Sequence, residues 1–276
     1  MIDTHVHVLS PDLSRYPRAS ADAAGAHYAA EAVSADALLE VIDPGSVQRV
    51  VLVQAFAAYG FDNRYVADAA RAHPERFAFI SGVDPFAGDQ QEAARGWLDL
   101  GSRGLRVIAM SADFDPSCLA PLFEVAGDRG ACMCLLAAPV VLGRLTAVLS
   151  AFPSVPLVLD HCGLQALSSD RDDLGAPELV DLARFDNVYL KVSTRVFNQA
   201  EGDAPVVIEK LVSRFGSERM LWGSDFPASV GPSSGASAAT AYASTLRIAQ
   251  EMTSCLNETD RDQILQATAE RLWPVG

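Results

Sequence analysis

Short apolar runs rich in β-branched residues recur along this chain, and stretches with apolar residues at positions i, i+3 and i+4 lie between them. Several runs, such as RVVLVQAF and VPLVLDH, lack polar–apolar alternation, which is typical of strands covered on both faces. Strands that alternate with helices form parallel sheets. We therefore predict eight strands, at Ile2–Val8, Arg49–Gln54, Phe77–Val83, Gly104–Ala109, Ala131–Ala137, Pro156–His161, Val188–Val192 and Met220–Ser224.

Eight strand–helix units in 276 residues predict one domain, residues 1–276, with the α/β architecture of a (β/α)8 TIM barrel, either regular or distorted. A doubly wound open sheet is the alternative, but it would usually show a glycine-rich phosphate loop after the first strand, where this chain has a long polar segment. The segment 229–239, SVGPSSGASAA, is predicted to be a mobile loop. Helices are predicted at Ala37–Ile42 with Ser34 as N-cap, Asn63–Ala72, Gln90–Leu100, Leu119–Asp128, Val140–Ala151, Pro177–Phe185, Pro205–Phe215, Ala238–Thr253 and from Asn257 onward.

The charge of the chain limits the classes of partner. A formal net charge of −14 without any Lys/Arg-rich run argues against nucleic acid and disfavours anionic membranes. No apolar run is long enough for a membrane helix, and no signal peptide opens the sequence. The five cysteines fit neither a zinc-finger nor a disulfide framework, so Cys132 and Cys134 are expected in a strand core. We expect a cytoplasmic protein whose partner is a small molecule; its oligomeric state is left open.

Polar residues gather at the predicted carboxyl ends of the strands, where TIM-barrel active sites lie. His5 and His7 are two residues apart on the first strand, so both side chains point to the same face. They could share a metal ion, clamp a polar ligand, or simply be solvated. The other polar residues at or near strand ends are Gln54, Arg106, Asp160, His161, Lys191, Ser193, Arg195 and Asp225.

Two arginines indicate which charge the substrate could carry. Arg106 and Arg195 could grip a carboxylate with two parallel hydrogen bonds, or each could pair with a neighbouring acid. Lys191 could bind substrate or pair with Asp160 on the adjacent strand. Further hydrogen bonds to substrate are expected from Gln54, Tyr59 and Asn63, although Tyr59 and Asn63 could also serve in loop packing and helix capping.

The segments IDTHVH, VLDHCG and LWGSDFP together resemble the signature segments of the amidohydrolase-related family. With GFDNRY and RGLRV, the similarity is to its lactonase branch, which includes 2-pyrone-4,6-dicarboxylate lactonase and sugar-acid lactonases, and it covers nearly the whole chain. The resemblance implies that Asp225 matches the aspartate that takes a proton from the attacking water. It further implies that His5 and His7 match the paired first-strand histidines and that His161 matches the sixth-strand histidine.

The pattern departs from the family at two positions. Strand four offers Arg106 in place of a bridging Lys or Glu, and strand five ends in CLLAAP without a histidine. A binuclear site is therefore not expected. One divalent metal, most simply zinc, could be held by His5, His7 and Asp225, and a metal-free site is equally compatible with the branch.

We therefore expect a hydrolase that opens a small carboxylated lactone with a water molecule activated by Asp225, His161 protonating the leaving group. The alternatives are a decarboxylase or hydratase of the same superfamily, and a non-catalytic binding protein built on a barrel. The missing fifth-strand histidine counts against a decarboxylase, and the presence of all four of His5, His7, His161 and Asp225 counts against a protein without catalytic activity.

Overall fold

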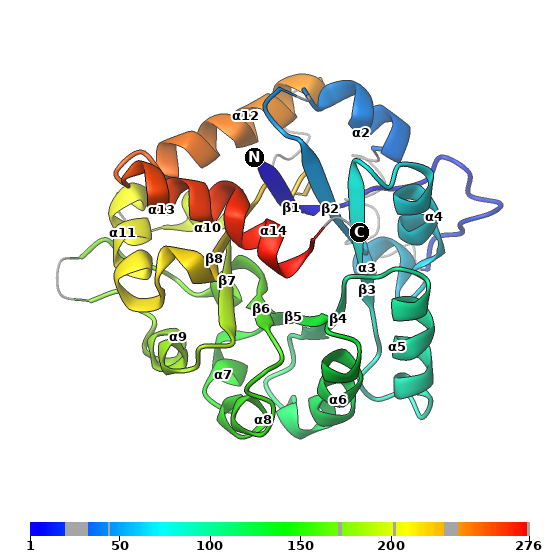
Figure 1. Ribbon diagram of the computed structural model, residues 1–276, viewed down its shortest axis with the longest axis horizontal. Helices are drawn as coiled ribbons and strands as arrows, with labels where there is room; N and C mark the ends of the chain where they lie inside the picture. The colour runs from blue at the N-terminus through cyan, green and yellow to red at the C-terminus, as the bar shows by residue number, and fades with distance from the viewer. Residues whose placement is uncertain (20–32, 44, 171–172, 201–202, 229–236, 275–276) are drawn as a thin grey trace.

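Eight parallel strands form the centre of the molecule, with helices around them (Figure 1). The computed structural model describes residues 1–19, 33–43, 45–170, 173–200, 203–228 and 237–274. The strands follow one another around the sheet in sequence order, as the (β/α)8 prediction requires. They are β1 (Ile2–Val6), β2 (Arg49–Val53), β3 (Phe77–Gly82), β4 (Gly104–Ala109), β5 (Cys132–Ala137), β6 (Leu157–Leu159), β7 (Val188–Ser193) and β8 (Met220–Gly223).

Helices cover the outside of the strands (Figure 1). Those of the described residues are α2 (Ala35–Val41), α3 (Phe56–Tyr59), α4 (Arg64–Ala72), α5 (Gln90–Asp99), α6 (Ala120–Asp128), α7 (Pro139–Leu142), α8 (Thr146–Ala151), α9 (Pro177–Asp181), α10 (Thr194–Gln199), α11 (Ala204–Phe215), α12 (Ala238–Met252), α13 (Glu258–Asp262) and α14 (Thr268–Leu272). Ser34 caps α2 by accepting a hydrogen bond from the backbone N–H of Ala37, as predicted.

The barrel closes where β8 meets β1. The backbone N–H of Asp225 donates to the carbonyl of His5 at 2.8 Å, and the N–H of His7 donates to the carbonyl of Phe226 at 2.8 Å. Gly223 makes this approach possible, because a Cβ at this position would lie 2.6 Å from the Cβ of His5. The closure therefore joins the ends of the first and last strands, which carry the histidine pair and Asp225.

A bulge in β1 decides which way the histidines point. Ile2 packs inside the barrel, whereas Val6 packs outside against the helices, although both are even-numbered. The pairing of β1 with β2 advances from Asp3 to Val6 on one strand but only from Val50 to Leu52 on the other. This extra residue exchanges the two faces of the strand, so that the odd-numbered residues after it face inward.

Trp273 fills the end of the barrel opposite the strands' carboxyl ends. Its side chain is buried in one cluster with the inward residues Ile2, Val51 and Leu221, and its indole N–H donates to the Sγ of Cys132 at 3.2 Å. The helix before it, α14, lies across this end of the barrel in Figure 1. Cys132 and Cys134 are buried in the same cluster, as expected for core residues.

The observed boundaries correct the prediction in several places. The predicted helix Val140–Ala151 is wrong as one helix: α7 and α8 are separated at Gly143, since glycine weakens a helix interior. The predicted helix Pro177–Phe185 is α-helical only to Asp181 and continues as a 3₁₀ turn. The predicted strand Pro156–His161 ends at Leu159, because the backbone turns left-handed at His161. Most of the loop predicted at 229–239 lies outside the described residues.

None of the helices in the described part of the chain is both long and apolar enough to cross a membrane.

We expect Trp273→Ala to destabilise the protein by about 3–5 kcal/mol, because it empties a fully buried position at the closed end of the barrel. Urea unfolding followed by circular dichroism measures this. Phe86→Ala is the matched control, since Phe86 is 68% exposed and its loss should change stability by no more than about 0.5 kcal/mol. Equal losses in the two variants would contradict the role given to Trp273.

Candidate active site

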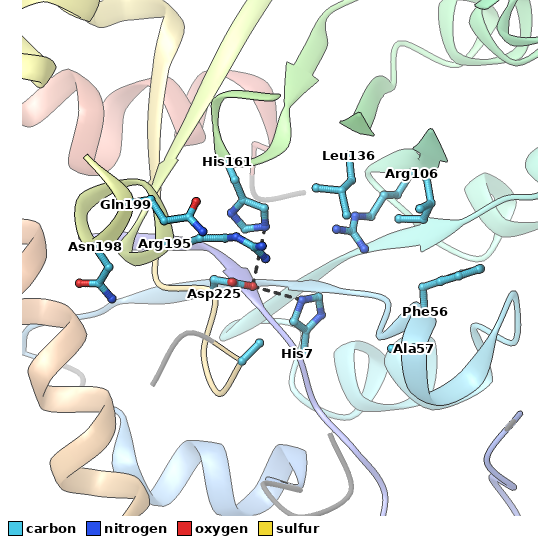
Figure 2. A pocket seen from close by; sticks show the side chains of 12 residues that line it. His7, Phe56, Ala57, Arg106, Leu136, His161, Arg195, Asn198, Gln199 and Asp225 are labelled. Atoms are coloured by element: carbon cyan, nitrogen blue, oxygen red, sulfur yellow. Dashed lines mark ion pairs between the residues drawn. The ribbon is translucent and has the colours of Figure 1, made fainter. Parts of the chain in front are cut away.

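The imidazoles of His5, His7 and His161 meet the carboxylate of Asp225 at the carboxyl ends of the strands. Figure 2 shows two of these rings, His7 and His161, beside Asp225. The Oδ1 of Asp225 lies 3.5 Å from the Nε2 of His7, 3.7 Å from that of His5 and 3.9 Å from that of His161. The two first-strand histidines bring their Nε2 atoms within 3.2 Å of each other. All four side chains are nearly or fully buried. The residues predicted to form the catalytic group are therefore brought together.

Left-handed backbone turns aim two of these side chains. His161 has φ 53° and Asp225 has φ 57°, a region that non-glycine residues rarely adopt. Each of the two residues lies just beyond the end of its strand, so the turn directs its side chain toward the barrel axis. Such strained positions are held only where the surrounding structure fixes them, and they cluster at functional sites.

The outward nitrogens of the imidazoles have their own partners. The Nδ1 of His7 donates to the carbonyl of Val53 at 2.8 Å, which leaves its Nε2 as the basic nitrogen. The Nδ1 of His161 lies 2.8 Å from the hydroxyl of Ser193. The Nδ1 of His5 lies 3.4 Å from the Oδ1 of Asp160. These contacts turn the Nε2 atoms of the three rings toward Asp225.

Burial shifts the pKa values of His5, His161 and Asp225. It lowers the pKa of His5 well below its ordinary value and also lowers the pKa of His161, so both rings are neutral near pH 7. Burial alone would raise the pKa of Asp225, but its interactions with His161, His7 and His5 outweigh this and hold the pKa below the usual range. The site therefore presents an ionised carboxylate beside two imidazoles, His5 and His161, that burial keeps uncharged near pH 7.

A second carboxylate, Asp160, lies deeper in the barrel between two cations. Its Oδ2 accepts a hydrogen bond from the Nε of Arg106 at 2.8 Å, and its Oδ1 lies 3.0 Å from the Nζ of Lys191. Asp160 and Lys191 are fully buried. Burial opposes ionisation of Asp160, but Lys191, His5 and Arg106 hold its pKa well below the ordinary value.

Three of the four residues, His7, His161 and Asp225, form the floor of a cavity of about 440 Å³, within the range typical of small-molecule sites. Asn198 and Gln199 lie on the opposite side of Asp225 from Phe56 and Ala57 in Figure 2. One wall is thus polar and the other apolar, the latter extended by Ile108 and Leu136. The full lining consists of His7, Phe56, Ala57, Arg106, Ile108, Leu136, His161, Arg195, Asn198, Gln199, Asp225 and Ala228.

Both predicted anion-binding arginines line this cavity. Arg106 uses Nε for Asp160, and among the described residues no hydrogen bond to its Nη nitrogens is found. Arg195 is exposed and has neither an ion pair nor a hydrogen bond within the described part of the chain. It lies in the first turn of α10, two residues past the end of β7 at Ser193.

Four other predicted substrate-binding residues do not line the cavity. Gln54 donates to the carbonyls of Gly60 and Asp62, and Asn63 bonds both backbone groups of Gly82. Tyr59 accepts from the backbone of Ser10 and from Arg18. These three side chains fix the loop after β2 to its surroundings. Lys191 is bound to Asp160, as the alternative interpretation held.

Sequence reasoning missed the amides of Asn198 and Gln199. Both follow Arg195 on α10, at i+3 and i+4, which places all three on one face of a helix. This spacing is visible in the sequence, but no helix was predicted between the strand Val188–Val192 and the helix Pro205–Phe215. The apolar wall was missed as well, although Ile108 follows Arg106 by two residues on β4 and must share its inward direction.

The donor set fits one divalent ion of the zinc type. Ligand atoms of a tetrahedral zinc site lie about 3.4 Å apart for bonds of about 2.0–2.2 Å. The Nε2 atoms of His5 and His7 and the Oδ1 of Asp225 are separated by 3.2, 3.5 and 3.7 Å. His161 also contributes to a group of possible ligand atoms, together with His5 and Asp225, that lie within 4.8 Å of one another. Strand β5 contributes only Leu136 to the cavity, so no ligand for a second ion comes from there.

Comparisons with known proteins agree with this arrangement. The family profile described as amidohydrolase matches residues 2–275. An L-fucono-1,5-lactonase from Burkholderia ambifaria is 27% identical over 207 residues, which is 66% of this chain and 66%, slightly under two thirds, of that protein.

Two solved structures share the fold. One, named a 2-pyrone-4,6-dicarboxylic acid hydrolase from Pseudomonas putida, is 24% identical with a TM-score of 0.76, covering 98% of this chain and 96% of that one. The other, an amidohydrolase from Burkholderia multivorans with bound zinc, is 22% identical with a TM-score of 0.72, covering 100% of this chain and 99% of that one. The sequence-based resemblance to this family and to its lactonase branch is confirmed.

We expect the purified protein to contain no more than one divalent ion per chain. The reason is that one group of ligands converges, while β4 and β5 offer Arg106 and Leu136 at the cavity in place of further ligands. Elemental analysis after dialysis against metal-free buffer, and again after incubation with zinc, provides the count. Two ions bound stoichiometrically to the wild type, with one lost in His5→Ala, would show that the site has been misread.

Proposed function

We propose that this chain, which belongs to the amidohydrolase family, hydrolyses a small carboxylated lactone. The observation that carries the proposal is the position of Asp225, a carboxylate held among three imidazoles on the floor of a cavity whose walls carry two arginines. The names of the similar proteins, a fuconolactonase and a pyrone-dicarboxylic acid hydrolase, support the same class of reaction.

Asp225 would act as the general base. It is ionised throughout the physiological pH range because its pKa is held low, and it lines the cavity. A water molecule beside it would give up a proton to the carboxylate as its oxygen adds to the lactone carbonyl. A base of such low pKa provides little driving force, so most of the rate acceleration must come from stabilisation of the oxyanion.

The groups for that stabilisation surround Asp225. Arg106 and His161 line the cavity, and donors fixed in advance are the strongest source of transition-state stabilisation. As the ring C–O bond breaks, the leaving oxygen needs a proton, which His161 would relay from Asp225. The ring opens to a hydroxy acid, and its new carboxyl group releases one proton to the medium.

A divalent ion is compatible with this scheme. His5, His7 and Asp225 would hold it with His161 beside them, and when bound it would polarise the carbonyl as a Lewis acid. We propose zinc as the ion, on the fit of the imidazole and carboxylate donors. Without an ion, the same residues carry the reaction through hydrogen bonds and the positive charge of Arg106.

The two arginines indicate the charge of the substrate. In a chain of net charge −14, a cavity that exposes Arg106 and Arg195 attracts small anions. The Nε of Arg106 donates to Asp160, so its two Nη nitrogens are left to bind a carboxylate. The apolar wall formed by Phe56, Ile108 and Leu136 suits the ring of the lactone.

The alternatives from the sequence are less well supported. Decarboxylation was disfavoured by the missing histidine of strand five, and Leu136 faces the cavity from that strand. A binding protein without activity would have no need for Asp225 and His161 in strained backbone conformations.

A panel of lactones with and without carboxyl groups, screened with a pH indicator, tests the proposal. Coumalic acid, a pyrone carboxylic acid, and its methyl ester form one matched pair. Proton release with at least one carboxylated lactone, exceeding that with its neutral partner, is expected. Carbon dioxide release from an aromatic acid without any lactone turnover would support the decarboxylase instead.

We expect Asp225→Asn to lower kcat by at least about 10²-fold while the fold is kept, because the amide cannot take the proton from water. Stopped-flow proton release and circular dichroism measure the two quantities. Asp84→Asn is the control, since Asp84 follows β3 at the same end of the barrel but does not line the cavity. A variant that retains most of its kcat would remove Asp225 from the mechanism.

We expect Arg106→Met to raise KM for the carboxylated substrate steeply, by an amount equivalent to about 2–5 kcal/mol, and to change KM for its neutral ester little. Arg195→Met should act in the same direction but less strongly, because Arg195 is exposed. Arg103→Met is the control: Arg103 precedes the same strand, β4, at the other end of the barrel. Equal effects on acid and ester would show that the arginines do not bind a carboxylate.

A further inference from the structure

We propose that Asp160 is a positioning residue that orients both the guanidinium of Arg106 and the imidazole of His5 for the reaction. The inference rests on the proposed function for its kinetic part, and on the geometry of the barrel interior for its structural part. Asp160 does not line the cavity, so any effect on substrate must pass through its neighbours.

The two oxygens of Asp160 have different partners. Oδ2 accepts from the Nε of Arg106 at 2.8 Å, whereas Oδ1 lies 3.0 Å from the Nζ of Lys191 and 3.4 Å from the Nδ1 of His5. The carboxylate is fully buried, as are Lys191 and His5. One rigid, dehydrated group thus contacts an arginine that lines the cavity and a histidine of the catalytic group.

The bond to Arg106 fixes the plane of its guanidinium. Nε is the nitrogen nearest the aliphatic stem, so anchoring it stops rotation of the planar group and leaves the Nη pair directed elsewhere. In Figure 2 the side chain of Arg106 reaches from β4 toward Asp225 and His7. Without Asp160, the guanidinium would lose the partner that holds it at the cavity wall.

The contact with His5 selects its tautomer. The negative charge of Asp160 lies 3.4 Å from Nδ1 and favours the proton of the ring on that nitrogen. The lone pair then lies on Nε2, which points at the Nε2 of His7 and at Asp225. This is the form that can bind an ion or accept a proton from a ligand in the cavity.

Lys191 supplies the balancing charge. The cations Arg106 and Lys191 lie in the same part of the barrel as the anions Asp160 and Asp225. A simple ion pair between Asp160 and Lys191 would need no contact with Arg106 or His5. The presence of those contacts separates a positioning role from a purely structural one and suggests how to test for it.

The test replaces both members of the buried pair, Asp160 and Lys191, in one variant. Asp160→Asn alone should leave Lys191 without its counter-ion and destabilise the protein. In Asp160→Leu/Lys191→Met, no unpaired charge from this pair remains, so stability should recover toward that of the wild type. If Asp160 positions its neighbours, kcat of the double variant should stay at least about 10-fold low and KM for the carboxylated lactone about 10-fold high. Kinetics as in the wild type would overturn the proposal.

Crystal structures give a readout that needs no substrate. We expect the guanidinium of Arg106 and the ring of His5 to be displaced in the double variant and to stay in place in Lys191→Met, which keeps Asp160. If the apolar pair does not fold, the structure and kinetics of Asp160→Asn replace it, with the same changes expected. Unmoved side chains in these variants would refute the positioning role, whereas an inactive wild type would refute the lactonase proposal alone.

Discussion

The contact between β8 and β1 is the constraint on which the site depends. It joins the two ends of a sheet that grows strand by strand along the sequence, and it does so through the backbones of His5, His7 and Asp225 themselves. Gly223 permits the approach, and the bulge in β1 turns the histidines inward. A single closure therefore completes the barrel and brings the carboxylate of Asp225 beside the imidazoles.

The second constraint is electrostatic. Arg106, Asp160, Lys191 and Asp225 are nearly or fully buried, and buried charges are tolerated only when they are paired. Asp160 meets this requirement with Lys191 and Arg106, while the carboxylate of Asp225 lies among the imidazoles of His5, His7 and His161. Asp160 is thus held inside the barrel, whereas Asp225 lines the cavity. A substrate or ion that enters the cavity meets the carboxylate of Asp225.

Much of the fold could be predicted from the sequence, because continuous β-branched runs give a strong signal. Strand β4 was predicted with its observed ends, and the other strands differ by one or two residues at their ends. The strand-end rule pointed to His5, His7, His161 and Asp225, whose side chains lie close together in the structure. The differences from the prediction depend on local backbone. The chain leaves β6 at Leu159, earlier than predicted, and it enters the helix α10 directly after Ser193, where no helix was predicted, so the amides on α10 were not foreseen. Gln54, Asn63 and Tyr59 follow a strand as substrate-binding residues do, yet their side chains turn back to hold the loop. The spacing of polar and apolar residues in the sequence cannot show whether such a side chain faces the cavity or turns back to the loop.

The left-handed backbones of His161 and Asp225 also bear on how such a sequence evolves. Aspartate and histidine are among the few residues other than glycine that adopt this conformation with some frequency. Glycine adopts it at no steric cost, but it would remove the imidazole or the carboxylate from the cavity. Laboratory evolution for heat tolerance, with no demand on activity, would be expected to accept glycine at these two positions.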